Sequence, residues 1–173
     1  MDGIAVTYGP GLMGALWVGL NFAKGLSIST NKPLVGVNHL KAHVFASWIK
    51  KDLETNKSFD TPKEFPLMCI IVSGGHTDLV KLDENYNFEL IGRTRDDAAG
   101  EAFDKAARLL NLGFPGGPEV DKYSSFSDEH FDFPRALLRG SHDFSFSGMK
   151  TAFLNLSEKN KPFDEDKISK LCN

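Results

Sequence analysis

A short apolar stretch, a glycine-rich turn and a long helical stretch open the chain, and this succession constrains the fold most. Residues 3–8 (GIAVTY) are rich in β-branched side chains and predict a strand, residues 9–11 (GPG) interrupt it, and residues 12–29 predict a helix with small residues on one side. Strand, glycine turn and helix form the unit from which open α/β sheets are built. Residues 33–37 predict the next strand, so the sequence predicts an α/β protein.

Two histidines follow the second predicted strand. Asn38 is a suitable N-cap for a helix from His39 to about Lys51. Positions i and i+4 of a helix lie on one face with Cβ atoms about 5–6 Å apart, so His39 and His43 can converge on one Zn²⁺ or Fe²⁺ ion. The spacing alone leaves open that they are two surface histidines, or that one belongs to the core.

The residue after the first histidine decides against one class of enzyme. Zinc proteases with two histidines at this spacing need a glutamate there as general base, and this chain has Leu40. A catalytic metal site normally takes three protein ligands. Asp78, His142 or a ligand outside the chain stay open as the third.

A polar segment separates the two halves of the chain. Residues 50–66 end in prolines and predict a boundary between two lobes. Beyond it the pattern predicts a buried strand apolar on both faces, a hairpin turn at Ser73-Gly74-Gly75-His76 and two more strands. These strands are residues 67–72, 77–82 and 88–93; helices are expected at residues 97–111 and 149–156, and an irregular loop at 113–118. The remaining residues predict a polar tail, from which we expect a fragment of a longer protein.

Two glycine-rich segments and several carboxylates are candidates for nucleotide binding. A Gly-Gly turn after a buried strand lets backbone N–H groups approach a phosphate, with hydroxyls from Ser73 and Thr77. Gly116-Gly117 offers a flat surface for an adenine ring. Asp97, Glu101 and Asp104 stand at helical spacing, and Asp121 follows the second glycine segment. The alternative is ordinary turns and a solvated helix face, with i,i+4 pairs from Glu101 to Lys105 and from Asp104 to Arg108.

Composition and charge restrict the class of protein. With 41% hydrophobic and 25% charged residues the chain is typical of a globular protein, and its net charge of -3 argues against binding nucleic acid through its overall field. Binding of nucleic acid through a basic face on one side of the protein stays open. Cys69 and Cys172 lie in unrelated contexts, so neither a disulfide nor a cysteine metal site is expected. We find no stretch of membrane-spanning length and no secretion signal, and expect a cytoplasmic protein.

Six motifs in one order resemble those of the TsaD family, the tRNA N6-adenosine threonylcarbamoyltransferases. They are TYGPGL (residues 7–12), GVNHLKAH (36–43), VSGGHT (72–77), DDAAGEAFDK (96–105), PGGP (115–118) and FSFSGMKT (144–151). The resemblance implies an actin-like ATPase (ASKHA) fold of two α/β lobes, here incomplete. Residues 1–64 would be the latter part of the N-terminal lobe and residues 65–173 the first part of the C-terminal lobe.

The same resemblance implies a function and a set of site residues. The function is transfer of the threonylcarbamoyl group from threonylcarbamoyl-AMP to N6 of the adenosine beside the anticodon, in tRNAs that read codons beginning with A. His39 and His43 match the family's metal ligands, for Fe²⁺ before Zn²⁺, and no catalytic residue beyond the metal site is implied. Substrate-binding positions would be Ile71, Val72, Ser73, Gly74, Gly75, Asp104, Gly117 and Asp121.

The resemblance also implies partners and an incomplete site. The partners are tRNA, a non-catalytic paralogue and a small ATPase of the same pathway, with no membrane. The family's third metal ligand, an aspartate, and a further nucleotide-contacting asparagine have no counterpart here, so we expect this chain alone to be inactive. Two alternatives stay open: a non-catalytic scaffold, and a phosphotransferase of the actin-like superfamily, against which the histidine pair speaks.

Overall fold

The computed structural model describes residues 1–49, 62 and 64–173. The chain divides into two compact units, Met1–Phe65 and Pro66–Asn173. The predicted boundary segment lies mostly outside the described residues. The structure is a mixed α/β protein, as predicted, and the assignment of the two units to lobes of an actin-like fold stays a prediction.

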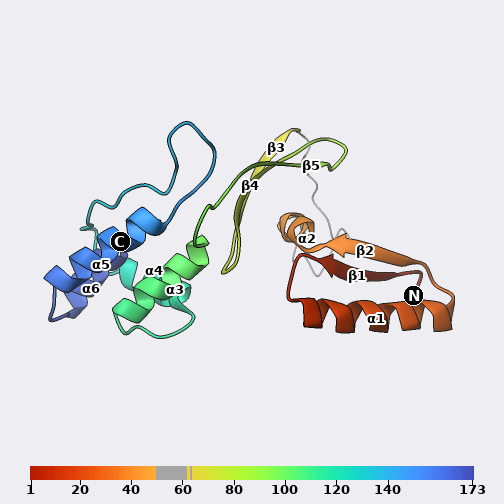
Figure 1. Ribbon diagram of the computed structural model, residues 1–173, viewed down its shortest axis with the longest axis horizontal. Coiled ribbons are helices and arrows are strands. Elements are labelled where there is room, and N and C mark those ends of the chain that lie inside the picture. The colour runs from red at the N-terminus through yellow and green to blue at the C-terminus, as the bar shows by residue number, and fades with distance from the viewer. Residues whose placement is uncertain (50–61, 63) are drawn as a thin grey trace, which may run out of the picture. The chain divides into compact units, whose positions relative to one another are not determined.

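In its described residues, the first unit consists of two parallel strands and two helices (Figure 1). Strand β1 (Ile4–Gly9) leads into helix α1 (Met13–Thr30), and β2 (Leu34–Asn38) leads into α2 (His39–Ala46). Because β1 and β2 are parallel and Gly9 pairs with Asn38, the first residue of α2 lies at the same sheet edge as the glycine turn. Parallel sheets gather functional residues at this carboxyl edge.

Helix α2 is capped as predicted but is shorter than predicted. The Asn38 side chain accepts hydrogen bonds from the backbone N–H groups of Leu40 and Lys41, at 3.0 and 3.1 Å. The helix ends at Ala46 and not near Lys51. The N–H groups of Trp48 and Ile49 bond to carbonyls three residues back, which tightens the chain into turns and interrupts the α-helical ladder.

The second unit begins with an antiparallel sheet of order β3-β4-β5. Its strands are β3 (Leu67–Val72), β4 (Thr77–Leu82) and β5 (Phe88–Arg93), as the sequence predicts. The prediction that β3 is buried on both faces is wrong for this unit. Met68, Ile70 and Val72 point to one face and are 56–61% exposed, because no element of the unit covers that face.

Four helices complete the second unit: α3 (Ala99–Leu109), α4 (Gly116–Ser124), α5 (Ser147–Lys159) and α6 (Glu165–Cys172). Two predictions are wrong here. Residues 116–118 are not a loop but the first turn of α4, where Pro118 is tolerated because first-turn N–H groups have no partner within the helix. The expected polar tail is helix α6, whose Leu171 is 2% exposed and packs with Leu110 and Phe153 in the core.

Within the described residues, no helix combines the length and the apolar character needed to cross a membrane. Cys69 and Cys172 are free thiols, and burial raises the pKa of Cys172 to about 11.

Candidate functional site

In the first unit, the two histidines of α2 converge as the sequence predicts. The Nε2 atoms of His39 and His43 are 3.1 Å apart, and both side chains are exposed. The Asn38 cap fixes the first turn, so the i,i+4 geometry is set by α2 itself.

The separation of the two nitrogens fits a shared metal ion. Two metal–nitrogen bonds of about 2.1 Å that meet at about 90–110° place their nitrogens about 3.0–3.4 Å apart. An N–H···N hydrogen bond between two neutral imidazoles suits the same distance, so the structure establishes convergence and not the ion. Among residues 1–49, 62 and 64–173, no third His, Cys, Asp or Glu completes a cluster with the pair.

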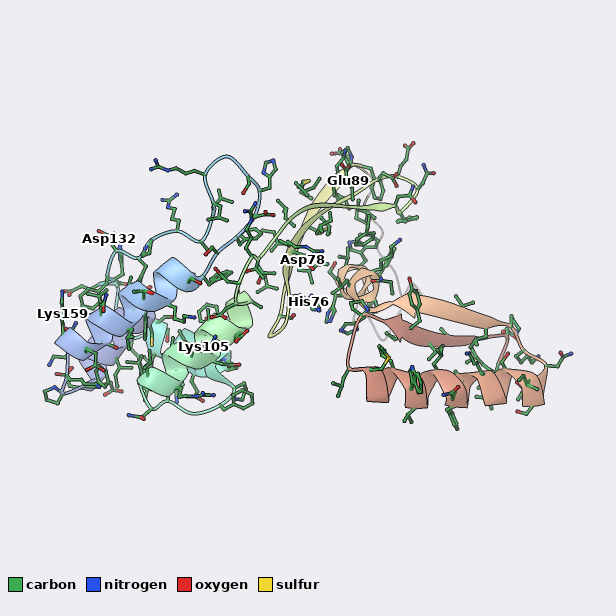
Figure 2. All side chains as sticks on the ribbon, in the orientation of Figure 1. His76, Asp78, Glu89, Lys105, Asp132 and Lys159 are labelled. Atoms are coloured by element: carbon green, nitrogen blue, oxygen red, sulfur yellow. The ribbon has the colours of Figure 1, made fainter. Side chains whose placement is uncertain are left out.

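The two third-ligand candidates, Asp78 and His142, both belong to the second unit. Asp78 is buried, and its carboxylate lies 3.7 Å from Nδ1 of His76 beside the hairpin turn (Figure 2). His142 is exposed, and its backbone carbonyl lies against Gly92. A role for either as a metal ligand stays a prediction.

The first glycine segment of the second unit is a hairpin turn closed by Ser73. The Ser73 N–H donates to the His76 carbonyl at 2.8 Å, and Oγ of Ser73 accepts from the N–H groups of His76 and Gly75, at 3.0 and 3.3 Å. Both lone pairs of this hydroxyl are therefore occupied, and its proton stays available to a ligand. A Cβ on Gly74 or Gly75 would meet nothing within 4 Å, so the outer surface of the turn is open.

Helix α3 packs its first turn directly against this hairpin. The Gly100 N–H donates to the Ser73 carbonyl at 3.2 Å, and a Cβ at Gly100 would lie 2.8 Å from the Gly74 backbone. The Thr77 hydroxyl, predicted to face a phosphate, is instead buried and accepts the Ala99 N–H at 2.9 Å. The N-terminus of α3 thus uses these N–H groups to hold the turn.

One helical turn further, α3 carries Asp104 on the same face as Gly100. The carboxylate of Asp104 accepts the backbone N–H of Gly116 at 2.7 Å, at the N-terminus of α4, where a negative charge is favourable. The predicted i,i+4 pair with Arg108 is therefore replaced by a contact across twelve residues. The predicted pair of Glu101 with Lys105 is confirmed, at 2.9 Å.

Helix α4 presents the remaining predicted residues to solvent. Gly116 faces α3, because a Cβ there would lie 2.6 Å from Cα of Asp104. Gly117 has nothing within 4 Å, and Asp121, four residues later on the same helix face, is exposed. Ile71 is buried and its backbone pairs with Asp78 of β4, whereas Val72 is 56% exposed.

Sequence reasoning missed polar residues beside Asp104. An open hollow of about 360 Å³ is lined by Asp104, Arg108, Asn111, Gly113 and Phe114. Residues 100, 104 and 108 share one face of α3, at spacings of four, and Asn111 follows two residues after the helix ends. This recurrence is the sequence signal that could have identified these residues. It indicates a face of α3 that begins beside the Ser73-Gly74-Gly75 turn and continues past Gly116-Gly117.

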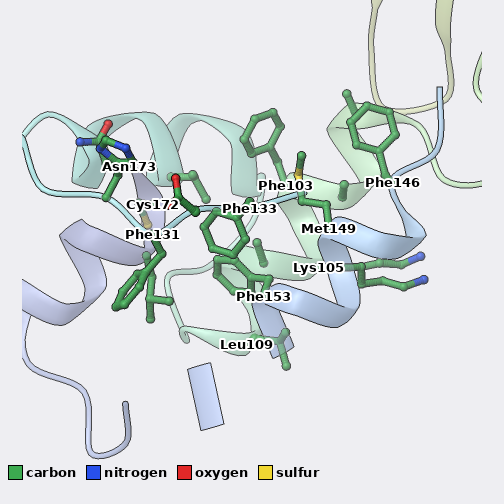
Figure 3. A pocket seen from close by; sticks show the side chains of 18 residues that line it. Phe103, Lys105, Leu109, Phe131, Phe133, Phe146, Met149, Phe153, Cys172 and Asn173 are labelled. Carbon is green, nitrogen blue, oxygen red and sulfur yellow. The ribbon is translucent and has the colours of Figure 1, made fainter. Parts of the chain in front are cut away.

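A second hollow, of about 410 Å³, lies on a different side of α3 (Figure 3). Its lining is mainly aromatic and aliphatic, with Phe131, Phe133, Phe153 and Met149, and includes none of the predicted substrate-binding residues. The lining also contains Lys105 and Lys150, but both lysines are bonded to Asp97, so this mostly apolar surface suits a phosphate poorly. The polar face of α3 is therefore the better candidate for nucleotide binding.

The fold also joins two motifs that the sequence treats separately. Asp96 accepts hydrogen bonds from the Ser145 hydroxyl, the Phe146 N–H at 2.8 Å and the Ser147 hydroxyl at 2.9 Å, at the start of α5. Asp97 accepts from Lys105 and Lys150, at 2.7 and 3.0 Å. These contacts attach FSFSGMK to the segment before α3.

Comparison with known proteins identifies the relatives of this chain. The TsaD family, described as tRNA N6-adenosine threonylcarbamoyltransferase, matches residues 1–172. This chain belongs to the TsaD family. The resemblance predicted from the six motifs is confirmed.

Individual relatives carry the same description. Similar proteins named tRNA N6-adenosine threonylcarbamoyltransferase occur in Symbiobacterium thermophilum (48% identity, covering 99% of this chain and 48% of the relative) and Dehalococcoides mccartyi (52%, covering 91% and 46%). Another, from Thermosipho africanus, is 51% identical and covers 98% of this chain and 48% of the relative. The chain thus spans about half the length of the curated relatives it matches.

Proposed function

We propose that this TsaD-family chain contributes metal and nucleotide ligands to an enzyme that transfers a threonylcarbamoyl group from threonylcarbamoyl-AMP to N6 of a tRNA adenosine. The adenosine is the one beside the anticodon in tRNAs that read codons beginning with A. The observation that carries the proposal is that α3 contacts an open Gly-Gly turn at Gly100 and the start of α4 at Asp104, next to the half-buried Gly117. Family membership over residues 1–172 supports the reaction class.

The residues of the second unit suit the adenylate. The backbone of residues 71–75 would hold the phosphate or the threonylcarbamoyl group, because glycines let backbone N–H groups approach closely. Gly117 would support the adenine ring, since a side chain there would occupy the open space. Asp104 and Asp121 would bind ribose hydroxyls, a usual role of carboxylates near a nucleotide.

The histidine pair of the first unit would hold one divalent ion, Fe²⁺ before Zn²⁺. When bound, such an ion supplies Lewis-acid polarisation of a carbonyl or phosphate oxygen. In the transfer, N6 attacks the carbamoyl carbon, the carbon–oxygen bond to phosphate breaks, N6 loses a proton and AMP leaves. The N–H groups of the glycine turn would stabilise the charge on the departing phosphate.

The proposal includes the fold, partners and location. The two units would be portions of the two lobes of an actin-like ATPase (ASKHA) fold. The partners would be tRNA, a non-catalytic paralogue and a small ATPase, all in the cytoplasm. Family membership is what supports these expectations.

A chimera tests the transfer. Residues 1–172 replace the matching segment of the Symbiobacterium thermophilum relative, and the chimera is given threonylcarbamoyl-AMP and unmodified tRNA. We expect threonylcarbamoyladenosine in the nucleoside digest by mass spectrometry, and its loss in the His39→Ala/His43→Ala variant together with the bound metal. The control is the single substitution Lys159→Gln, at an exposed residue of α5. Unchanged metal content and transfer in the double variant would contradict the proposal. Binding of the paralogue without transfer would indicate a scaffold.

A further inference from the structure

Arginine is distributed very unevenly in this chain. Of five arginines, Arg93, Arg95, Arg135 and Arg139 fall in two short segments, and the fifth is Arg108 on α3. None of the four has a role in the proposed transfer. The fifteen lysines extend from Lys24 to Lys170, and four of them lie within residues 159–170.

The fold brings the two segments together as one ribbon. Residues 93–95 pair with residues 143–145, since the Arg95 N–H donates to the Phe144 carbonyl and the Phe144 N–H donates to the Arg93 carbonyl, both at 2.9 Å. Residues 143–145 pair in turn with residues 136–138, with the Ser145 N–H donating to the Ala136 carbonyl at 2.7 Å. We call residues 93–95 and 135–145 the arginine ribbon; its second part forms the long loop before α5 in Figure 1.

One carboxylate fixes the ribbon without neutralising it. Asp143 accepts the Arg93 N–H at 3.0 Å and bonds to Nε of Arg95 at 2.8 Å. Asp143 is the single acidic residue within the ribbon, which holds four arginines, and Asp96 bonds to the Ser145 hydroxyl at the end of the ribbon. Within the part of the chain that the structure describes, the guanidinium groups of Arg93, Arg135 and Arg139 form no ion pair.

All four arginine side chains are accessible from solvent. Arg95 is 63% exposed although it pairs with Asp143, and the other three are exposed as well. A guanidinium presents a planar fork of donors that matches the oxygens of a phosphate, and it is more weakly hydrated than an ammonium group. Four such forks on one hydrogen-bonded ribbon suit a ligand that carries several phosphates.

We propose that the arginine ribbon binds the sugar-phosphate backbone of the tRNA, apart from the reacting nucleotide. That the ligand is tRNA rests on the proposed function, whereas the inference that the ligand carries several phosphates rests on the exposed arginines of the ribbon. An anionic membrane surface fits less well, because Leu137 is the one ribbon side chain that is both large and apolar and strongly exposed, at 59%. The ribbon gives a chain of negative net charge a local basic face for RNA.

Fluorescence anisotropy of the 173-residue chain with labelled unmodified tRNA, over a series of salt concentrations, tests the proposal. In Arg135→Gln/Arg139→Gln we expect binding about tenfold weaker or more. The slope of log K against log salt is negative, and we expect its magnitude to fall by about 1.4, at about 0.7 for each phosphate that the variant no longer neutralises. The charge-matched control Lys32→Gln/Lys159→Gln, at two other exposed sites, should change neither quantity. Arg135→Lys/Arg139→Lys should keep the slope and weaken binding a few-fold.

Several outcomes overturn the proposal. One is that the unsubstituted chain does not bind tRNA in low salt. Another is that the double glutamine variant, with an unchanged circular dichroism spectrum, binds tRNA as tightly as the unsubstituted chain. A third is that the chain binds phosphatidylserine vesicles and not RNA. The chimera distinguishes failure of the ribbon proposal from failure of the proposed transferase function. Transfer with an unchanged KM for tRNA in Arg135→Gln/Arg139→Gln rejects the ribbon alone. Ribbon-dependent RNA binding without transfer rejects the transferase alone.

Discussion

Gly116 and Gly117 are consecutive residues of α4 with opposite surroundings. A Cβ on Gly116 would lie 2.6 Å from Cα of Asp104 and 2.7 Å from Cβ of Ala107, which are backbone or rigid atoms that cannot move aside. A Cβ on Gly117 would meet nothing within 4 Å. The first glycine therefore sets how closely α4 packs on α3, and the second leaves space for a ligand.

Substitution by alanine separates these two roles. We expect Gly116→Ala to lower the free energy of unfolding by about 2–3 kcal/mol, because overpacking forces α3 and α4 apart. Gly117→Ala, the matched control, should leave it unchanged or raise it by up to about 1 kcal/mol, since alanine is favoured in a helix and meets no neighbour. Urea unfolding followed by circular dichroism measures both. Equal effects of the two substitutions would show that the close approach at Gly116 does not hold α4 in place.

At the scale of single residues, the sequence predicts contacts that arise from spacing and misses those that arise from packing. The convergence of His39 with His43 follows from a helical period, and so does the pair of Glu101 with Lys105. The alternative to a substrate-binding role paired Asp104 with Arg108 in its own helix, but Asp104 bonds to the N–H of Gly116. That bond depends on where α4 packs, which local spacing does not contain.

Among the elements, the strands and most helices were predictable, and the short helices α4 and α6 were not. β5 has the predicted bounds, because its pattern is strong and local. Helix α4 was hidden by its glycines and proline, and α6 by its charged residues. The signal for α6 was present in Ile168, Leu171 and Cys172, at spacings of three and one, which place three apolar side chains against the core.

Helix α5 depends on a carboxylate outside it. Partial desolvation, the largest single effect, raises the pKa of Asp96, but hydrogen bonds from Ser145, Phe146 and Ser147 outweigh it and lower the pKa to about 2. A lowered pKa means that ionised Asp96 stabilises the folded state above its unfolded pKa of about 3.8, and that this contribution disappears as the pH falls toward 2.

The Asp96→Asn variant tests this dependence. Because the side chain is exposed to solvent, which screens the interaction, we expect it to be less stable than the unsubstituted chain by about 1 kcal/mol at pH 5 to 7, with the difference vanishing between pH 4 and pH 2. Urea unfolding at each pH gives the difference. Asp128→Asn is the control, an exposed carboxylate that accepts no hydrogen bond in the described part of the chain. A difference that persists at pH 2 would show that the loss does not come from ionisation.

At the scale of the whole chain, the second unit draws its core from its own residues. Leu110, Phe153 and Leu171 form a buried cluster, and the partly buried side chains around it come from residues 106–172. Strand β4 pairs with both β3 and β5, and α4 packs closely on α3 at Gly116. The unit has about 110 residues, well above the roughly 40 below which a chain usually needs disulfides or metals to fold.

Residues 66–173 should therefore fold when expressed alone. We expect a cooperative urea transition in circular dichroism whose midpoint equals that of the same unit in the full chain, since the buried cluster is complete within the fragment. In this fragment Leu171→Ala should cost about 2–4 kcal/mol, because it removes a fully buried side chain from the cluster. Leu137→Ala, at a leucine that is 59% exposed, should cost less than about 0.5 kcal/mol. A fragment without a cooperative transition would mean that the apolar face of β3, with Met68, Ile70 and Val72, must be covered before the unit is stable.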